Sequence, residues 1–164
     1  MKICKSASNG INFKCLGCGK CCSTEQDGYV FLYWPDLIRL REGLNSSLKD
    51  IAEKYLQIVT YNYIVWNKKL GETGKKITLD SLALNYYPDE DCIFLEKKES
   101  YGHCSIYQFR PQQCRLYPFW NTIFLSDIEF RSTHISCPGM KLTKTESMFY
   151  SLNKIRKLLN QERK

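Results

Sequence analysis

Cys15-Leu16-Gly17-Cys18-Gly19-Lys20-Cys21-Cys22 is the stretch around which this chain is expected to fold. Four cysteines fall within these eight residues, and the two glycines among them allow the backbone to turn tightly. A turn of this kind brings several thiolates toward one point, as in proteins that hold a metal through sulfur. The stretch predicts an irregular, cysteine-rich centre rather than a regular helix or strand.

The chain holds five further cysteines, and four of them are predicted to complete that centre. Cys4 falls outside the pattern and is predicted to be a small buried hydrophobic residue. The eight predicted metal ligands come in two halves: Cys15, Cys18, Cys21 and Cys22 from the turn, and Cys92, Cys104, Cys114 and Cys137 from the second part of the chain. The segment between the two halves is predicted to pack around the centre as helices.

Length and composition set the class of protein. At 164 residues the chain is predicted to form a single domain over 1–164, with a loose arm at 1–14, the cysteine-cluster region at 15–139 and a C-terminal helix at 143–164. There is no apolar run of about 18 residues and no secretory leader, so we expect a cytoplasmic protein without a membrane span. Disulfides are disfavoured in that compartment, and nine cysteines there indicate metal binding first and redox chemistry second.

The secondary structure is predicted to be α+β and mainly α-helical, with short strands around the cysteine centre. A strand is expected at 29–33, a helix from Pro35 to a stop at Gly43, and a second helix from Ser46 or Ser47 through Val59. Further strands are expected at 77–84 and twice within 120–130. Residues 89–91 are expected to form a solvated loop. Thr143 and Glu146 resemble a capping box at the start of the final helix.

The ligand chemistry leaves two metals open. Zinc takes four sulfur ligands, and an iron–sulfur cluster such as 4Fe-4S also takes about four thiolates. Cys15-x-x-Cys18-x-x-Cys21 matches the start of a bacterial ferredoxin run, whose fourth cysteine precedes a proline as Cys137 does here. Eight cysteines allow one site or two. The formal charge of +7 would fall to about +3 with eight thiolates and two divalent metals, so the basic residues can offset an anionic centre.

Three other side chains are candidates to support the centre. Arg110 and Arg115 flank Cys114, where a guanidinium could donate to sulfur or neutralise the cluster, or could simply be solvated. Tyr107 could donate its hydroxyl toward the site or pack as a core aromatic residue. His103 and His134 lie near cysteines but are less favoured as ligands.

The ordered set of motifs resembles the YkgJ-like cysteine-cluster family, described as a zinc- or iron-chelating domain. The resemblance rests on residues 13–139: Phe13-x-Cys15-x-x-Cys18-x-x-Cys21-Cys22, Cys92-x-Phe94-Leu95, Cys104-x-Ile106-Tyr107-x-x-Arg110-Pro111-x-x-Cys114-Arg115-x-x-Pro118-Phe119 and Cys137-Pro138-Gly139. It implies metal or iron–sulfur binding but no particular reaction. A related cysteine region occurs in flagellin lysine N-methylases, which are longer proteins.

Three functions are therefore compared. The favoured one is a protein that binds zinc or iron, in the latter case also as an iron–sulfur cluster, through the eight cysteines. The alternative is a cluster-dependent enzyme for group transfer, such as protein lysine methylation, or for thiol redox chemistry. The chain has no H-E-x-x-H helix, Gly-x-Ser-x-Gly elbow or dinucleotide fingerprint to identify an activity. The basic tail, Lys154, Arg156, Lys157, Arg163 and Lys164, is weak support for a nucleic-acid partner, and no protein partner can be named.

Overall fold

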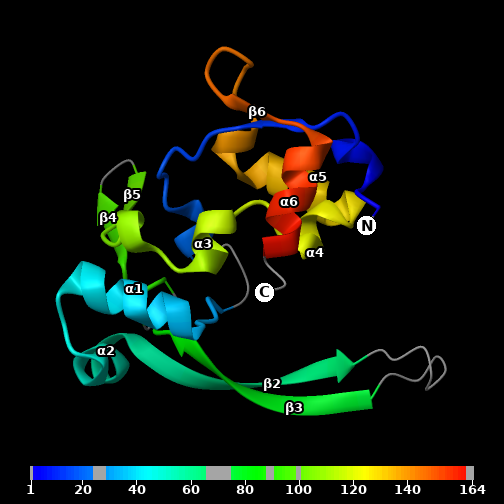
Figure 1. The fold of residues 1–164 in the computed structure, drawn as a ribbon. Helices are drawn as coiled ribbons and strands as arrows, with labels where there is room; N and C mark the ends of the chain where they lie inside the picture. Colours follow the sequence, from blue (N-terminus) through cyan, green and yellow to red (C-terminus); the bar gives the residue numbers. More distant parts are fainter. Residues whose placement is uncertain (1, 24–28, 66–74, 88–90, 99–100, 162–164) are drawn as a thin grey trace.

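The computed structural model describes residues 2–23, 29–65, 75–87, 91–98 and 101–161, and it is of the predicted α+β class (Figure 1). The α-helices are α1 (Trp34–Leu44), α2 (Leu48–Tyr55), α3 (Gln112–Leu116), α4 (Asn121–Phe124), α5 (Asp127–Ser136) and α6 (Leu152–Gln161). The strands form antiparallel pairs: β1 (Ile11–Phe13) with β6 (Met148–Tyr150), β2 (Leu56–Val65) with β3 (Lys75–Leu84), and β4 (Leu95–Lys98) with β5 (Tyr101–Cys104). Single 3-10 turns include η1 (Lys5–Ala7), η2 (Lys20–Cys22), η4 (Tyr107–Phe109) and η5 (Pro138–Met140).

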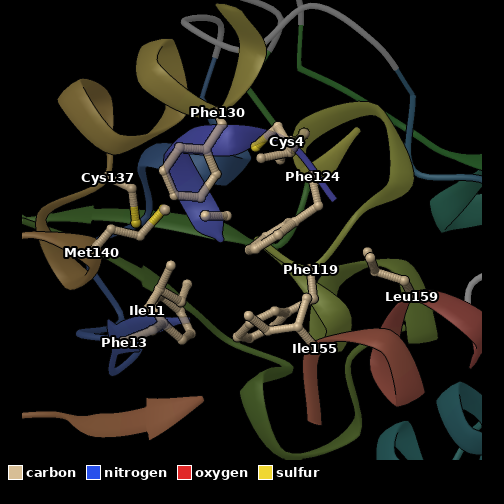
Figure 2. Close-up of a cluster of buried hydrophobic side chains, with 12 residues drawn as sticks. Cys4, Ile11, Phe13, Phe119, Phe124, Phe130, Cys137, Met140, Ile155 and Leu159 are labelled. Atoms are coloured by element: carbon tan, nitrogen blue, oxygen red, sulfur yellow. The ribbon is translucent and has the colours of Figure 1, made fainter. Parts of the chain in front are cut away.

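Two clusters of buried side chains hold the elements together. The first joins the N-terminal segment and β1 to α4, α5 and α6, and its centre is aromatic (Figure 2). In this cluster Phe119 stacks on Phe124 with ring centroids 5.5 Å apart, and Cys137 lies at its edge beside Met140. The second joins α1 and α2 to the base of the β2–β3 hairpin and to β4. Each cluster therefore contains, or packs against, part of the cysteine set.

The N-terminal segment is not the loose arm that the sequence predicted. Ala7 is completely buried, and the backbone N–H of Cys4 donates to the carbonyl of Phe124 at 2.9 Å. β1 then pairs with β6, so Ile11 lies opposite Tyr150. The burial of Cys4 in this cluster agrees with its prediction as a small hydrophobic residue. The segment is ordered by partners more than 100 residues away, which local sequence does not reveal.

The two helices predicted after the cysteine turn are present, with shifted ends. α1 begins as expected around Pro35, but it runs past Gly43 and ends at Asn45, which adopts a left-handed conformation at φ 48°. α2 begins after Ser47, whose hydroxyl accepts a hydrogen bond of 3.1 Å from the Asp50 backbone N–H. The predicted strand at 29–33 is reduced to a single bridge between Phe31 and Ala83.

The prediction of helix through Val59 is wrong, because the chain becomes strand β2 at Leu56. This stretch is rich in β-branched and aromatic residues, which suit a pleated strand. It pairs with β3 over ten residues, from Leu56 opposite Leu84 to Val65 opposite Lys75. The predicted strand at 77–84 is thereby confirmed, and the long hairpin extends away from α1 and α2 (Figure 1).

Three further expectations need correction. The two strands expected within 120–130 are helices α4 and α5, and Ser126 caps α5 by accepting from the Glu129 backbone N–H. Thr143 and Glu146 make half of a capping box, because the Glu146 carboxylate accepts from the Thr143 backbone N–H while the Glu146 N–H donates to the Thr143 carbonyl. They close a turn, since the final helix α6 begins only at Leu152 after strand β6. Asp91 is not solvated: it is buried and forms an ion pair with Lys97. Asp89, Glu90, Arg163 and Lys164 lie outside the described residues.

Among the described residues, no helix is both long and apolar enough to cross a membrane.

Candidate metal centre

The eight cysteines of the predicted ligand set come from chain segments that the fold brings together. Cys15 to Cys22 form the turn that ends in η2, Cys92 precedes β4, and Cys104 ends β5. Cys114 is on α3, and Cys137 follows α5 immediately before η5. In Figure 1, α3 lies between the pair α1 and α2 and the group α4, α5 and α6.

Gly19 allows the cysteine turn to pack closely against the β4–β5 hairpin. It adopts φ 74°, a left-handed conformation that side chains disfavour, and a Cβ atom there would lie 2.7 Å from Leu95 and 2.8 Å from the Cα of Gly102. The backbone N–H of Gly102 donates to the carbonyl of Cys18 at 3.3 Å. Gly17 is also left-handed, at φ 63°, but the space around it is open. The closely packed glycine therefore fixes where the turn lies.

Two backbone hydrogen bonds bring distant cysteines next to the turn. The N–H of Cys92 donates to the carbonyl of Cys22 at 2.8 Å. The N–H of Lys14 donates to the carbonyl of Gly139 at 3.2 Å, so the segment after Cys137 lies beside Cys15. Both bonds are long-range, and they join the first half of the cysteine set to the second.

Seven of the eight cysteines border two neighbouring cavities. Cys15, Cys18, Cys21, Cys22, Cys104 and Cys137 line the first cavity, together with Tyr107, Arg110 and Tyr117. Cys15 and Cys21 also line the second cavity, which adds Cys114 and Arg115. Cys92 is buried beneath the turn, bonded to Cys22 as described.

The thiols affect one another's protonation. The sulfur atoms of Cys21 and Cys22 are 3.8 Å apart. Hydrogen bonding with Cys22 lowers the pKa of Cys21, and it lowers the pKa of Cys104 to about 7. The same bonds, to Cys104 first and to Cys21 next, raise the pKa of Cys22 far above its ordinary value. Burial raises the pKa of Cys92 to about 11 and raises that of Cys114 further.

Arg110 lies among the thiols and is held there by Tyr107. Its guanidinium carbon is 3.9 Å from the centroid of the Tyr107 ring, and its Nε donates to the Tyr107 carbonyl at 3.2 Å. The charge of Arg110 also lowers the pKa values of Cys21, Cys104 and Cys114, by less than the hydrogen bonds and burial described above change them. It therefore favours the thiolate forms. Arg110 therefore lies beside the thiols, and its role in supporting a bound metal stays a prediction.

The other two supporting candidates differ in their surroundings. A hydrogen bond to Cys15, followed by burial, raises the pKa of Tyr107, so its hydroxyl faces a predicted ligand. Arg115 borders the second cavity, but its pKa is lowered by burial and then by the charge of Arg39, on the side of α1. Arg115 is therefore less directly associated with sulfur than Arg110.

Tyr117 also lies at the site, where the sequence did not predict it. Burial first, and then the charge of Cys137, raise the pKa of its hydroxyl, which hydrogen-bonds to that thiol. The only sequence signal is its position between Cys114 and Pro118. The side chain of His134 stacks on Phe130 instead of joining the thiols, with ring centroids 6.4 Å apart.

The thiols are gathered but not yet arranged as a coordination sphere. In the part of the chain that the structure describes, no three Cys, His, Asp or Glu side chains already converge as the ligands of a metal do. The donors themselves suit zinc, iron or an iron–sulfur cluster, because thiolates are preferred ligands of all three. Binding would require the side chains to rotate inward and the neutral thiols to lose their protons.

Comparisons with known proteins give the following matches. Residues 14–138 match the family model CxxCxxCC, described as "Putative zinc- or iron-chelating domain". An uncharacterized protein of Methanocaldococcus jannaschii is 30% identical over 111 residues, which cover 68% of this chain and 47% of that protein. The chain thus spans about half the length of this curated relative. No solved structure matches the chain.

Proposed function

Because the chain belongs to the CxxCxxCC family of cysteine-cluster domains, we propose that its eight family cysteines bind zinc or iron as thiolates. One observation carries the proposal: cysteines from distant segments border two adjoining cavities, with Arg110 among them. A structural role for each cysteine as a separate hydrophobic residue does not account for this gathering, since seven of the eight border the cavities and Cys92 is bonded to the backbone of Cys22.

The surroundings of the thiols support this proposal over a set of unreactive buried groups. Arg110 supplies positive charge near Cys21, Cys104 and Cys114, and Tyr107 and Tyr117 can donate their hydroxyls to the sulfurs of Cys15 and Cys137. Hydrogen bonds and charges of this kind orient the ligands of a metal and stabilise thiolates. A bound zinc ion would be held structurally by four thiolates, whereas an iron–sulfur cluster would supply electron transfer.

The iron–sulfur form is the more specific part of the proposal. It is supported by the ferredoxin-like spacing of Cys15, Cys18 and Cys21 together with the position of Cys137 beside the same cavity. We also propose that the protein works in the cytoplasm, where reducing conditions keep thiols available for metal.

The proposal is tested by purifying the protein without oxygen and measuring iron, zinc and acid-labile sulfide per chain. Iron with matching sulfide and visible absorption would identify an iron–sulfur protein, and zinc alone would identify a zinc protein. Cys18→Ala and Cys114→Ala should each lower metal content. Cys4→Ala is the matched control, because Cys4 is buried away from both cavities. A wild-type chain without metal, or equal metal in all variants, would refute the proposal and leave thiol redox chemistry as the better hypothesis.

A further inference from the structure

We propose that the eight cysteines form two adjacent four-thiolate sites, the first from Cys15, Cys18, Cys21 and Cys137, and the second from Cys22, Cys92, Cys104 and Cys114. This inference rests on the proposed function, because it assumes that the cysteines bind metal. It adds the number of sites and the ligands of each.

The assignment begins with the adjacent pair Cys21 and Cys22. Both lie on η2, a 3-10 turn, in which successive side chains point about 120° apart because there are about three residues per turn. Cys21 borders both cavities, together with Cys15 in each case. Cys22 borders only the first cavity and packs against the second hydrophobic cluster, beside α1 and β4. Their sulfur atoms are 3.8 Å apart, so the two groups of cysteines meet at this pair. The different surroundings of Cys21 and Cys22 are the basis on which we assign them to different metals.

The first site lies toward the N-terminal cluster. Cys15, Cys18, Cys21 and Cys137 all border the first cavity, which Cys22 and Cys104 of the second site also line. The hydrogen bond from Lys14 to Gly139 fixes the chain on either side of Cys15 and Cys137. Cys137 itself belongs to the N-terminal cluster (Figure 2).

The second site lies toward the α1–α2 cluster. Cys22, Cys92 and Cys104 all belong to or pack against that cluster. The Cys92 backbone N–H donates to the Cys22 carbonyl at 2.8 Å. Cys104 is paired across the β4–β5 hairpin with Leu95, whose N–H donates to the Cys92 carbonyl at 2.8 Å. Three of the four ligands are therefore held by one continuous hydrogen-bonded unit.

Cys114 completes the second group. Cys114 borders the second cavity together with Cys15 and Cys21, so it lies where the two groups of cysteines meet. The first site already has four sulfur ligands, the number that either zinc or a four-iron cluster takes. Arg110 borders both cavities and therefore lies between the two groups.

The test counts zinc bound to single-alanine variants. The metal-free protein is titrated with Zn²⁺ under anaerobic conditions, and native mass spectrometry counts the zinc ions on each folded molecule. We expect the wild type to bind two zinc ions, and Cys21→Ala and Cys22→Ala to bind one each. Cys4→Ala should keep two. A wild type that binds a single zinc, or single variants that lose both, would overturn the two-site assignment.

Pairs of substitutions then test which cysteines share a site. Cys21→Ala combined with Cys137→Ala should still bind one zinc, because both changes damage the first site. Cys22→Ala with Cys92→Ala should do the same for the second site. The mixed pair, Cys21→Ala with Cys92→Ala, should bind none. One zinc on the mixed pair, or none on a same-site pair, would show that the ligands are divided differently.

Failure to fold and failure of the proposed function are both distinguishable from failure of this inference. Native mass spectrometry separates compact from unfolded molecules by charge state, so zinc is counted only on folded chains. If one pair does not fold, Cys18→Ala with Cys137→Ala and Cys104→Ala with Cys92→Ala replace the same-site pairs. A wild type that binds no zinc, and that carries no iron when purified, would refute the proposed function itself. Two metals with a different division of ligands would refute only the inference.

Discussion

The carboxylate of Asp36 accepts a hydrogen bond of 2.7 Å from the backbone N–H of Gln112. Its other oxygen accepts from the backbone N–H of Tyr33 at 3.2 Å. One buried side chain thereby joins the start of α1 to the start of α3, the helix that carries Cys114. Because α3 has only five residues, this external anchor sets its position more than its own helical hydrogen bonds do.

Asp36→Asn should therefore destabilise the protein and weaken metal binding. Hydrogen bonds to charged groups contribute about 1.5–3 kcal/mol each, so we expect a loss of about 2 kcal/mol in the free energy of unfolding. The measurement is urea unfolding of the metal-free chain, followed by zinc affinity. Asp80→Asn is the control, because Asp80 accepts a hydrogen bond from Thr60 on the exposed hairpin. Equal effects of the two substitutions would contradict the anchoring role.

Gly19 and Gly17 offer a matched comparison within the cysteine turn. Both have positive φ, so alanine costs about 1–2 kcal/mol at either position. Only at Gly19 would the new Cβ collide with Leu95 and Gly102, adding about 1–3 kcal/mol. We expect Gly19→Ala to lower stability and metal content more than Gly17→Ala, as measured by thermal unfolding and elemental analysis. Equal losses would mean that the packing of the turn on β4–β5 is unimportant.

Removal of the Arg110 charge should weaken metal binding without removing a ligand. Substitution of groups that support metal ligands typically lowers metal affinity by about 10–100-fold, and we expect a loss of about tenfold for Arg110→Gln. Arg110→Lys should keep part of the effect, because it retains the charge but not the planar stack on Tyr107. Arg115→Gln is the comparison, since its surroundings are on the side of α1. Competition with a chromophoric zinc chelator provides the affinities, and an equal loss in both variants would contradict the assignment.

Metal binding should release protons and weaken in acid. The pKa of Cys92 is raised to about 11 by burial and that of Cys22 is raised by its hydrogen bonds, so both are neutral thiols at pH 7. Each must lose its proton to become a ligand. Zinc added to the metal-free protein in weak buffer should acidify the solution, and the affinity should fall as the pH is lowered from 8 to 6. A pH-independent affinity over this range would show that these thiols are not ligands.

Asp127 should make the docking of the N-terminal segment sensitive to acid. Its carboxylate accepts from the backbone N–H groups of Ser6 at 2.8 Å and Lys5 at 3.3 Å. Hydrogen bonds from Ser6, first from the side chain and then from the backbone, lower the pKa of Asp127. The stabilisation is therefore present above the usual carboxyl pKa of about 3.9 and is lost as the pH falls through the lower folded value.

Amide hydrogen exchange at Cys4 and Ala7 can measure this effect. Asp127→Asn should reduce protection at neutral pH, and the difference from wild type should shrink below about pH 4. A difference that persists unchanged in stronger acid would mean that another group anchors the segment.

The sequence predicted the parts of this structure that depend on neighbouring residues. The start of α1 next to Pro35 and the start of α2 after Ser47 are determined by local capping chemistry. The sequence predicted that the eight cysteines gather at one centre, and seven of them border the two adjoining cavities. Their service as metal ligands stays a prediction.

The errors occurred where distant partners decide the outcome. Residues 56–59 have helical spacing, but pairing with β3 makes them a strand. The N-terminal segment has no strong local signal, and it is ordered by β6 and α5. Asp91 reads as a polar loop residue, yet it is buried against Lys97. Tyr117 was missed because only the folded chain shows that its hydroxyl faces Cys137.

X-ray absorption spectroscopy of the anaerobically purified protein, at the iron or zinc edge, tests the central claim most directly. We predict a first coordination shell of about four sulfur atoms per metal at about 2.3 Å, supplied by the cysteine thiolates and, in a cluster, by sulfide. The shell should lose sulfur in Cys18→Ala and remain unchanged in Cys4→Ala. A shell made mainly of nitrogen and oxygen, or a protein without bound metal, would contradict the account.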